Sequence, residues 1–347
     1  NIKLSEGTNS IKFQKALGDW GWMFVDSFII DNATENTWNF NISDELINSE
    51  ADKKTKKLYK YLCSIYGEQM LAGQQLYFGE EEEIDRILEV TGKYPALKGY
   101  DMINQTPGGS IDDQVDRAKE WYLEHKGIVT MCWHWWAPKY EREFYTEKTQ
   151  FDITKAVTPG TEEYDLIIRD MDIVAQRLKE MEDAGIPVLW RPLHEASGGW
   201  FWWGAKGPEA FKELWKLMYE RFTYHHELNN LIWVWNGQGP DWYVGDEYCD
   251  IVGEDIYPGE RVYSANPIKF GECHDIVKGG KPIALTETGC LPSIDQMEET
   301  GAWWIWFMIW WGDFITTDKY NDYEMLKYIY NHENVITLDE LPNFERS

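Results

Sequence analysis

The sequence contains few cysteines, few basic residues and no long apolar run. Its five cysteines (Cys63, Cys132, Cys249, Cys273 and Cys290) are scattered, without a CxxC pair or a zinc-finger spacing. At most two disulfides could form, and a chain of 347 residues can bury a large core without any. With 33 Lys and Arg against 60 Asp and Glu, the net charge is -27 and is spread along the chain. This charge argues against nucleic acid or an anionic membrane as partner.

The longest apolar run, Ala302 to Trp311, is far shorter than the roughly 20 residues that a membrane-spanning helix needs. The chain begins at Asn1 without a methionine or an apolar leader, so no signal peptide reveals the compartment. Its length fits one α/β barrel of about 250 residues with insertions. We therefore expect one large core, no membrane contact and a monomer.

Aromatic residues are abundant instead: the chain holds 20 Trp and 20 Tyr, many of them next to Gly, Asn, Asp or His. Roughly half of them fit simple core filling. The others fit a groove for a sugar, because the C–H face of a pyranose ring packs on an indole while its hydroxyls form hydrogen bonds at the rim. A carbohydrate is therefore the first candidate ligand.

From about Lys53 onward, short apolar runs alternate with amphipathic charged segments, which is typical of a parallel sheet covered by helices. Eight such units predict a (β/α)8 TIM barrel over residues 46–347, with the functional residues at the carboxyl ends of its strands. The predicted strands are Met70 to Gln75, Ala96 to Ile103, Gly127 to Trp136, Ile186 to Glu195, Leu231 to Gly237, Asp250 to Tyr257, Pro282 to Gly289 and Trp303 to Trp310.

Helical patterns between these strands show apolar residues at a spacing of three to four. Several of them end on a glycine, at Gly92, Gly127, Gly185 and Gly279, where a left-handed cap is expected. The clearest helical segments are Glu80 to Val90, Gln114 to Glu124, Glu162 to Ala184, Pro208 to Glu227 and Ala265 to Val277.

Residues 1–45 do not share this rhythm and are expected to form a separate N-terminal β segment. Ile11 to Lys15 and Trp22 to Ile30 have the pattern of two strands joined by a turn. The segment Leu4 to Ile30 resembles the closing strands of β-sandwich carbohydrate-binding modules of family 35 or family 6, although it is too short for a whole module. A β-hairpin packed across the barrel is the alternative, and we assign no sugar binding to this segment.

Two acids lie at the ends of predicted strands that face each other across a closed barrel. Glu195 ends the run WRPLHE, and Glu287 lies near the end of PIALTETG. Glycoside hydrolysis needs such a pair, one carboxyl protonated and one ionised, and a separation of about 5–5.5 Å implies retention of configuration. On the residues alone, Asp101, Glu254 and Asp255 are alternative strand-end acids.

Several stretches from about residue 50 to the C-terminus are similar to one known family. They are GEQMLAGQQ, CWHWWAPKYEREFY, LIWVWNG, DIVGEDIYPG, ALTETG and, most specifically, RPLHE followed by GWFWWG. In these motifs the chain resembles the family 26 glycoside hydrolases, whose best-known members are β-mannanases. The resemblance implies that Glu195 is the general acid/base and Glu287 the nucleophile of a double displacement. It also implies that His194 hydrogen-bonds a sugar hydroxyl and that Tyr257 orients the nucleophile and keeps it ionised.

The same resemblance implies a set of substrate-binding side chains. Trp200 would shape the cleavage point, and His134, Trp135 and Trp310 would form the sugar-binding floor. In some family members the tryptophan on strand eight precedes an arginine that binds a distal sugar, whereas Trp311 follows Trp310 here. The number of sugar-binding positions on the non-reducing side is therefore open.

The predicted function is a retaining, endo-acting hydrolase of β-1,4-mannosidic bonds in mannan, glucomannan or galactomannan. The alternatives are the same mechanism on mixed-linkage β-1,3-1,4-glucan or β-1,3-xylan, and a non-catalytic carbohydrate-binding protein. A metal-dependent hydrolase using His134, His194, Asp255 and Glu287 is a further alternative, but these residues show no local ligand motif.

We therefore expect no metal and no required cofactor, and leave a structural calcium open. The expected partners are β-mannan polysaccharides and manno-oligosaccharides. From the family resemblance, we expect a secreted, extracellular protein that is part of a longer chain with carbohydrate-binding or docking modules.

Overall fold

The computed structural model describes residues 38–77, 81–107, 109–110, 112–139 and 142–344. Most of the expected N-terminal β segment, residues 1–37, lies outside this range. Residues 38–45 are described and contain no strand. Trp38 and Phe40 pack on Phe270, with ring centroids 5.3 and 6.3 Å away. Trp38 and Phe40 are therefore joined to α7 (Pro267–Ile276) of the barrel through aromatic contacts.

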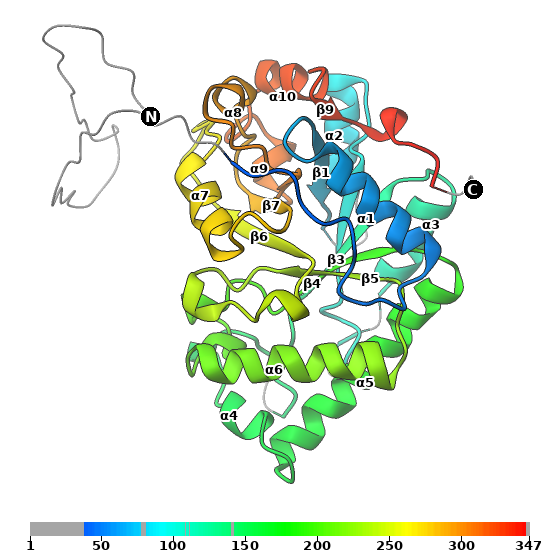
Figure 1. Cartoon of the computed structure of the whole chain (residues 1–347), viewed down its shortest axis with the longest axis vertical. Coiled ribbons are helices and arrows are strands. Elements are labelled where there is room, and N and C mark those ends of the chain that lie inside the picture. The colour runs from blue at the N-terminus through cyan, green and yellow to red at the C-terminus, as the bar shows by residue number, and fades with distance from the viewer. Residues whose placement is uncertain (1–37, 78–80, 108, 111, 140–141, 345–347) are drawn as a thin grey trace, which may run out of the picture. The chain divides into compact units, whose positions relative to one another are not determined.

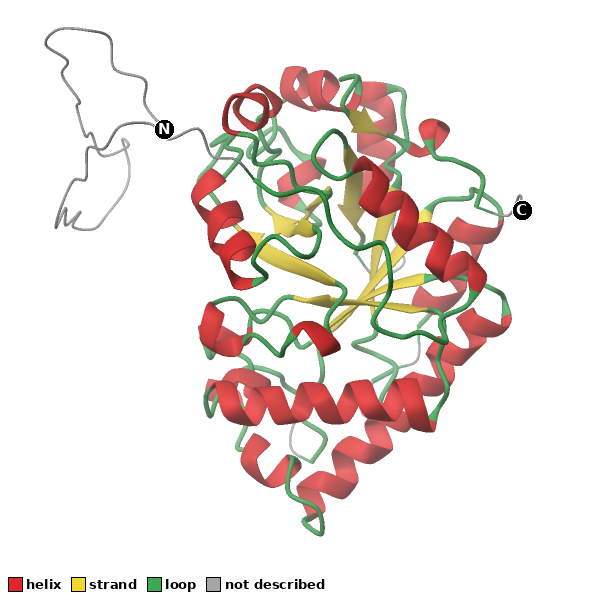
Figure 2. Ribbon diagram, viewed as in Figure 1, coloured by secondary structure: helices red, strands yellow, loops and turns green. Residues whose placement is uncertain are grey.

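Eight parallel strands close into a barrel, because β1 pairs with both β2 and β8 and the other strands pair in sequence order. Figure 2 shows the strands at the centre with helices packed around them. The predicted (β/α)8 fold is confirmed, with each strand inside or equal to its predicted range. The strands are β1 (Met70–Gln75), β2 (Leu97–Asp101), β3 (Ile128–Trp133), β4 (Val188–Pro192), β5 (Leu231–Trp235), β6 (Ile251–Ile256), β7 (Ile283–Thr288) and β8 (Trp306–Ile309).

A ninth strand, β9 (Val335–Ile336), was not predicted. It pairs with the start of β1, through Met70 opposite Val335 and Leu71 opposite Ile336. A two-residue strand carries too little periodicity to be read from sequence.

Helices cover the outside of the barrel (Figure 1). The connection from β5 to β6 contains only the short 3-10 turns Pro240–Trp242 and Asp246–Tyr248, and α6 ends in a π-helical turn, Arg221–His225. None of the described helices combines the length and the apolar character needed to cross a membrane. The α-helices are α1 (Lys53–Ile65), α2 (Glu82–Thr91), α3 (Gln114–Leu123), α4 (Ile153–Ala156), α5 (Glu162–Asp183), α6 (Pro208–Glu220), α7 (Pro267–Ile276), α8 (Ile294–Thr300), α9 (Asp313–Thr316) and α10 (Tyr323–Tyr330).

The predicted glycine caps are mostly correct. Gly92, Gly185 and Gly279 have φ of 73°, 68° and 64°, in the left-handed region. The left-handed cap predicted at Gly127 is wrong, because the preceding residue, Lys126, adopts the left-handed conformation instead, with φ 64°. Gly127 serves another purpose: a Cβ at this position would lie 2.1 Å from the Trp121 indole, so only glycine allows that ring to pack here.

Tryptophan fills much of the core. Within the described residues, eleven tryptophans are fully buried. The strands themselves are almost entirely buried on both faces, as expected for a parallel barrel covered by helices. The polar residues at the carboxyl ends of the strands are therefore the exceptions that call for a chemical explanation.

Candidate active site

Glu195 lies just beyond β4, in a sharp turn of the chain. Leu193 and Glu195 have φ of 52° and 53°, a left-handed conformation that is uncommon for residues with a β-carbon. Glu195 N donates to Asn236 O (2.7 Å), and Ser197 N donates to Gly237 O (2.9 Å). These bonds to the segment after β5 stabilise a turn that would otherwise be strained.

Trp200 contacts the Glu195 carboxyl. Its Nε1 donates to Glu195 Oε2 (3.0 Å), and its side chain is 46% exposed. The loop after β3 holds Trp200 in place, because Thr146 N donates to Trp200 O (2.7 Å) and Thr146 Oγ1 donates to Gly199 O (2.8 Å). The indole is thus a fixed rim residue beside the predicted acid/base.

Glu287 lies in β7 and is buried. Tyr257 OH donates to its Oε2 (2.6 Å), and the guanidinium of Arg191 donates to its Oε1. The two donors fix the orientation of the Glu287 carboxyl group. The contact between Tyr257 and Glu287 that the family resemblance implies is present in the structure.

The two carboxylates lie close together. One carboxylate oxygen from each of Glu195, Asp255 and Glu287 lies within 4.8 Å of the others. Retaining glycosidases hold their two carboxyl groups about 5–5.5 Å apart, whereas inverting enzymes need about 6.5–9.5 Å. Burial and the negative charge of Glu287 raise the pKa of Glu195 to about 7, although the Trp200 hydrogen bond acts in the opposite direction. The pair therefore combines one carboxyl that retains its proton near neutral pH with one that accepts two hydrogen bonds.

Arg191 and Asp255 complete this cluster. Arg191 Nη1 donates to Asp255 Oδ2 and to Asn236 Oδ1, both at 3.1 Å, and Thr286 Oγ1 donates to Asp255 Oδ1 (2.7 Å). Burial and the charge of Glu287 raise the pKa of Asp255 well above its ordinary value, against the effect of Arg191. Sequence reasoning missed Arg191, although a basic residue inside an otherwise apolar parallel strand is itself a signal of a buried ion pair.

Asp101, His134 and His194 form a second polar chain. His134 Nδ1 lies 2.6 Å from Asp101 Oδ2, and His134 Nε2 lies 3.2 Å from His194 Nε2. Burial lowers the pKa of His134, but the Asp101 carboxylate outweighs it and the net pKa is raised. Burial and the charge of His134 lower the pKa of His194 well below its ordinary value. His194 is only 1% exposed, so its predicted contact with a sugar hydroxyl stays a prediction.

The predicted aromatic contacts divide into two groups. Trp200 and Tyr257 are exposed, and Trp310 is half-buried with its ring 6.1 Å from that of His134. Trp135 is instead fully buried: its ring stacks on Trp133 with centroids 4.0 Å apart, and its Nε1 donates to Asp170 Oδ2 (3.0 Å). The structure therefore places Trp135 in the core and not on the expected sugar-binding floor.

The site also brings together groups that could ligate an ion. Within the described residues, Glu195, Asp255 and Glu287 form one such group, and Asp101, Cys132 and His134 form another. In the first group, Asp255 and Glu287 already form ion pairs with the cationic Arg191 side chain. The metal and cofactor expectations are not tested by this geometry and stay predictions.

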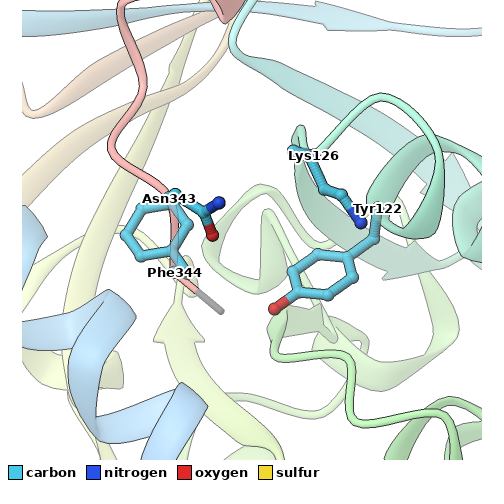
Figure 3. A pocket seen from close by; sticks show the side chains of 4 residues that line it. All are labelled: Tyr122, Lys126, Asn343 and Phe344. Atoms are coloured by element: carbon cyan, nitrogen blue, oxygen red, sulfur yellow. The ribbon is translucent and has the colours of Figure 1, made fainter. Parts of the chain in front are cut away.

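A small hollow lies elsewhere, lined by Tyr122, Lys126, Asn343 and Phe344 (Figure 3). Tyr122 belongs to the last turn of α3, and Lys126 leads into the start of β3. The hollow is therefore at the amino ends of the strands, the face that serves stability in this fold, while the carboxyl ends carry the chemistry.

A (β/α)8 barrel with a close pair of carboxylates at the carboxyl ends of β4 and β7, set in an aromatic rim, defines a glycoside hydrolase. Comparison with known proteins identifies which one: the sequence model of "Glycosyl hydrolase family 26" matches residues 47–340, and the chain belongs to this family. It is 39% identical to a mannan endo-1,4-beta-mannosidase of Thermothelomyces thermophilus over the whole chain and 72% of that protein. It is 38% identical to mannan endo-1,4-beta-mannosidase B of Piromyces sp over 99% of the chain.

Solved structures give the same family. The GH26-CBM35 beta-(1,4)-mannanase of Podospora anserina superposes with a TM-score of 0.83 at 40% identity, over 90% of this chain and 72% of that one. A beta-mannanase from a symbiotic protist of the termite Reticulitermes speratus, complexed with gluco-manno-oligosaccharide, superposes with a TM-score of 0.82 at 35% identity, over 88% of this chain and 99% of that one. The chain spans only 61% of the Piromyces relative, so that protein contains further sequence.

Proposed function

We propose that the chain is an endo-acting β-mannanase that cleaves internal β-1,4-mannosidic bonds with retention of configuration. The observation that carries the mechanism is the closeness of Glu195 and Glu287, with oxygens within 4.8 Å, in opposite electrostatic surroundings. The substrate rests on the relatives, which are named as mannan endo-1,4-beta-mannosidases. Mannan, glucomannan and galactomannan are the proposed substrates.

In the first step, a Glu287 oxygen attacks the anomeric carbon and the bond from that carbon to the glycosidic oxygen breaks. The proton of Glu195 passes to the leaving oxygen, and a covalent glycosyl ester remains on Glu287. Tyr257 and Arg191 donate hydrogen bonds to the attacking carboxylate and hold it in position before the step.

In the second step, the ionised Glu195 takes a proton from water while the water oxygen bonds to the anomeric carbon. The ester bond from the anomeric carbon to Glu287 breaks in the same step, which restores the Glu287 carboxylate. The charge of Glu287 is one cause of the raised pKa of Glu195, so esterification removes that cause. Glu195 thereby becomes a better base when the base is needed.

Azide rescue tests the two roles separately. Glu287→Ala and Glu195→Ala should each lower mannan hydrolysis by at least about 1,000-fold. With dinitrophenyl β-manno-oligosaccharides, whose leaving group departs without protonation, azide should then restore turnover with opposite stereochemistry: an α-mannosyl azide from Glu287→Ala, where azide replaces the nucleophile, and a β-mannosyl azide from Glu195→Ala, where it intercepts the glycosyl ester. NMR of the products distinguishes them, and wild-type turnover in either variant would overturn its assignment.

Glu254→Gln is the matched control, because Glu254 is also a buried carboxylate but lies in β6. Its side chain contacts Lys269 and Cys273 and no residue of the Glu195–Glu287 pair. This variant should retain hydrolysis with normal kinetics.

A substrate panel tests specificity. Linear mannan, glucomannan and galactomannan should be cleaved to short oligosaccharides with a rapid fall in viscosity, which is the mark of internal cleavage. Mixed-linkage β-1,3-1,4-glucan and β-1,3-xylan should be cleaved far more slowly. Release of only mono- or disaccharide without a fall in viscosity would replace endo with exo action.

We further propose that the enzyme acts as a monomer outside the cell, in a longer native protein with a carbohydrate-binding or docking module. The similarity to the Podospora GH26-CBM35 protein and the incomplete coverage of the relatives support this organisation. Light scattering should give a mass near 40.9 kDa for this chain. Immunodetection in the culture medium of the native host tests the extracellular location.

A further inference from the structure

Two aromatic side chains are exposed side by side at neighbouring strand ends. Tyr77 follows β1, and Trp311 follows β8, the strand that pairs with β1. Their ring centroids are 4.5 Å apart, and the side chains are 39% and 36% exposed. Neither residue was among the predicted substrate-binding residues. Two large aromatics that remain this exposed while contacting each other present a joint apolar surface to solvent.

A buried carboxylate fixes the backbone of this pair. Glu83, in the first turn of α2, is 2% exposed and its Oε1 accepts a hydrogen bond from Gly312 N (3.0 Å), next to Trp311. Burial raises the pKa of Glu83, while the backbone N–H groups of Gly312 and Tyr77 both lower it. One acid therefore interacts with the backbone at Tyr77 and at Gly312, the residue after Trp311. Gly312 has φ 70°, which a residue with a side chain would adopt only with strain.

The neighbouring end of β8 is fixed as well. Gln74 is fully buried, and its Nε2 donates to Ile309 O (3.2 Å) and Trp310 O (3.4 Å). The rings of Tyr77, Trp310 and Trp311 are thus attached to anchored backbone. A surface whose conformation is set before binding loses little entropy when a ligand binds.

The pair is continuous with the candidate active site. The Trp311 ring centroid is 6.2 Å from that of Trp310, and Trp310 is 6.1 Å from His134. The step from Trp310 to Trp311 is comparable to the length of one sugar residue in a β-1,4-linked chain. A polysaccharide that lies against Trp310 would therefore meet the Tyr77–Trp311 surface with a neighbouring ring.

We propose that Tyr77 and Trp311 form a stacking platform for one pyranose ring of the substrate, next to the cleavage position and on the β8–β1 side of the barrel. This proposal rests on the proposed glycoside hydrolase function. The platform contacts the apolar C–H face of the sugar, which requires no particular hydroxyl configuration. It therefore binds mannose and glucose units alike, and it contributes affinity for chain length while leaving the choice of bond to the site around Glu195.

The test compares chain lengths. The variants Tyr77→Ala, Trp311→Ala and the double variant are assayed on mannotriose through mannohexaose, alongside galactomannan. For mannohexaose, kcat/KM should fall roughly 10-fold in Trp311→Ala, which corresponds to about 1.4 kcal/mol of binding energy, mostly through KM. The loss should be smaller for the shortest oligosaccharide that the wild type cleaves.

Two controls separate stacking from structure. Trp311→Phe and Tyr77→Phe keep an aromatic face and should retain most of the wild-type kcat/KM. Tyr224→Ala removes another exposed aromatic, 68% exposed in the π-helical turn after α6, and should leave the length dependence unchanged. Thermal unfolding identifies any variant that is destabilised as a whole.

Two results would overturn the platform: a mannohexaose kcat/KM within about twofold of wild type in the double variant, or an equal loss at every chain length. Either can occur while the wild type still cleaves mannan and Glu287→Ala does not, in which case the proposed function stands. If the wild type cleaves no polysaccharide, the proposed function fails first.

Discussion

Replacement of Trp200 by phenylalanine should move the alkaline limb of the pH–rate profile to higher pH. The indole donates a hydrogen bond of 3.0 Å to Glu195 Oε2, which favours the ionised carboxyl. A hydrogen bond to a charged group contributes about 1.5–3 kcal/mol when buried, and at 46% exposure of Trp200 we retain roughly a third of this, about 0.5–1 kcal/mol. That free energy corresponds to about half a pH unit.

The wild-type profile of kcat/KM should show an alkaline limb near pH 7, where Glu195 loses the proton that the leaving group needs. In Trp200→Phe the limb should lie about half a unit higher, whatever happens to the maximal rate. The assay is reducing-sugar release from a soluble galactomannan between pH 4 and pH 10. Trp242→Phe, a half-buried tryptophan beyond β5, is the control and should leave the limb unmoved. A limb that stays in place or moves down in Trp200→Phe would refute the link between this hydrogen bond and the acid.

Three further predictions concern the same cluster. Burial raises the pKa of Glu195 above its unfolded value, so its ionisation destabilises the fold increasingly as pH rises from about 4.5 to about 7. Glu195→Gln should therefore raise Tm by roughly 2–4 °C at pH 8 and not at pH 4, and an increase at both pH values would contradict this account. Arg191→Met leaves Asp255 and Glu287 without their shared cation, so kcat/KM should fall by about 100-fold or more and Tm should drop by several degrees. Near-normal activity in this variant would exclude a role for the ion pair. Exhaustive chelation with EDTA should leave both kcat/KM and Tm unchanged, whereas a fall in Tm alone would indicate a structural calcium.

The barrel could be predicted from sequence because its signal is repetitive. Eight short apolar runs separated by amphipathic segments allow few topologies other than a closed parallel sheet. Most predicted strands were longer than the observed ones, because the sequence pattern continues beyond the last residue that pairs with a neighbouring strand. The strand predicted to end at Glu195, for example, ends at Pro192. The short strand β9 and the helix-free connection from β5 to β6 had no comparable pattern.

The candidate site was only partly predictable. Glu195 and Glu287 could be placed on one rim by periodicity, but the resemblance was needed to select them from other strand-end acids. The position of Arg191 inside an apolar strand indicated a buried ion pair, but its partners, Asp255 in β6 and Glu287 in β7, became known only from the structure. The resemblance implied a place for Trp135 on the sugar-binding floor, but the structure buries this side chain, and its Nε1 donates to Asp170 Oδ2 on α5, a contact between distant segments that the sequence does not reveal.

The backbone bonds from Glu195 and Ser197 to Asn236 and Gly237 have a consequence for engineering this enzyme. Glu195 follows β4 in the sequence, but its backbone position is fixed by hydrogen bonds to the residues that follow β5. Changes in the loop after β5 should consequently alter turnover without contacting any sugar. A directed-evolution library confined to the exposed aromatic side chains would not sample these positions, whereas residues 236–238 offer a way to adjust the acid without replacing Trp200, which contacts its carboxyl group.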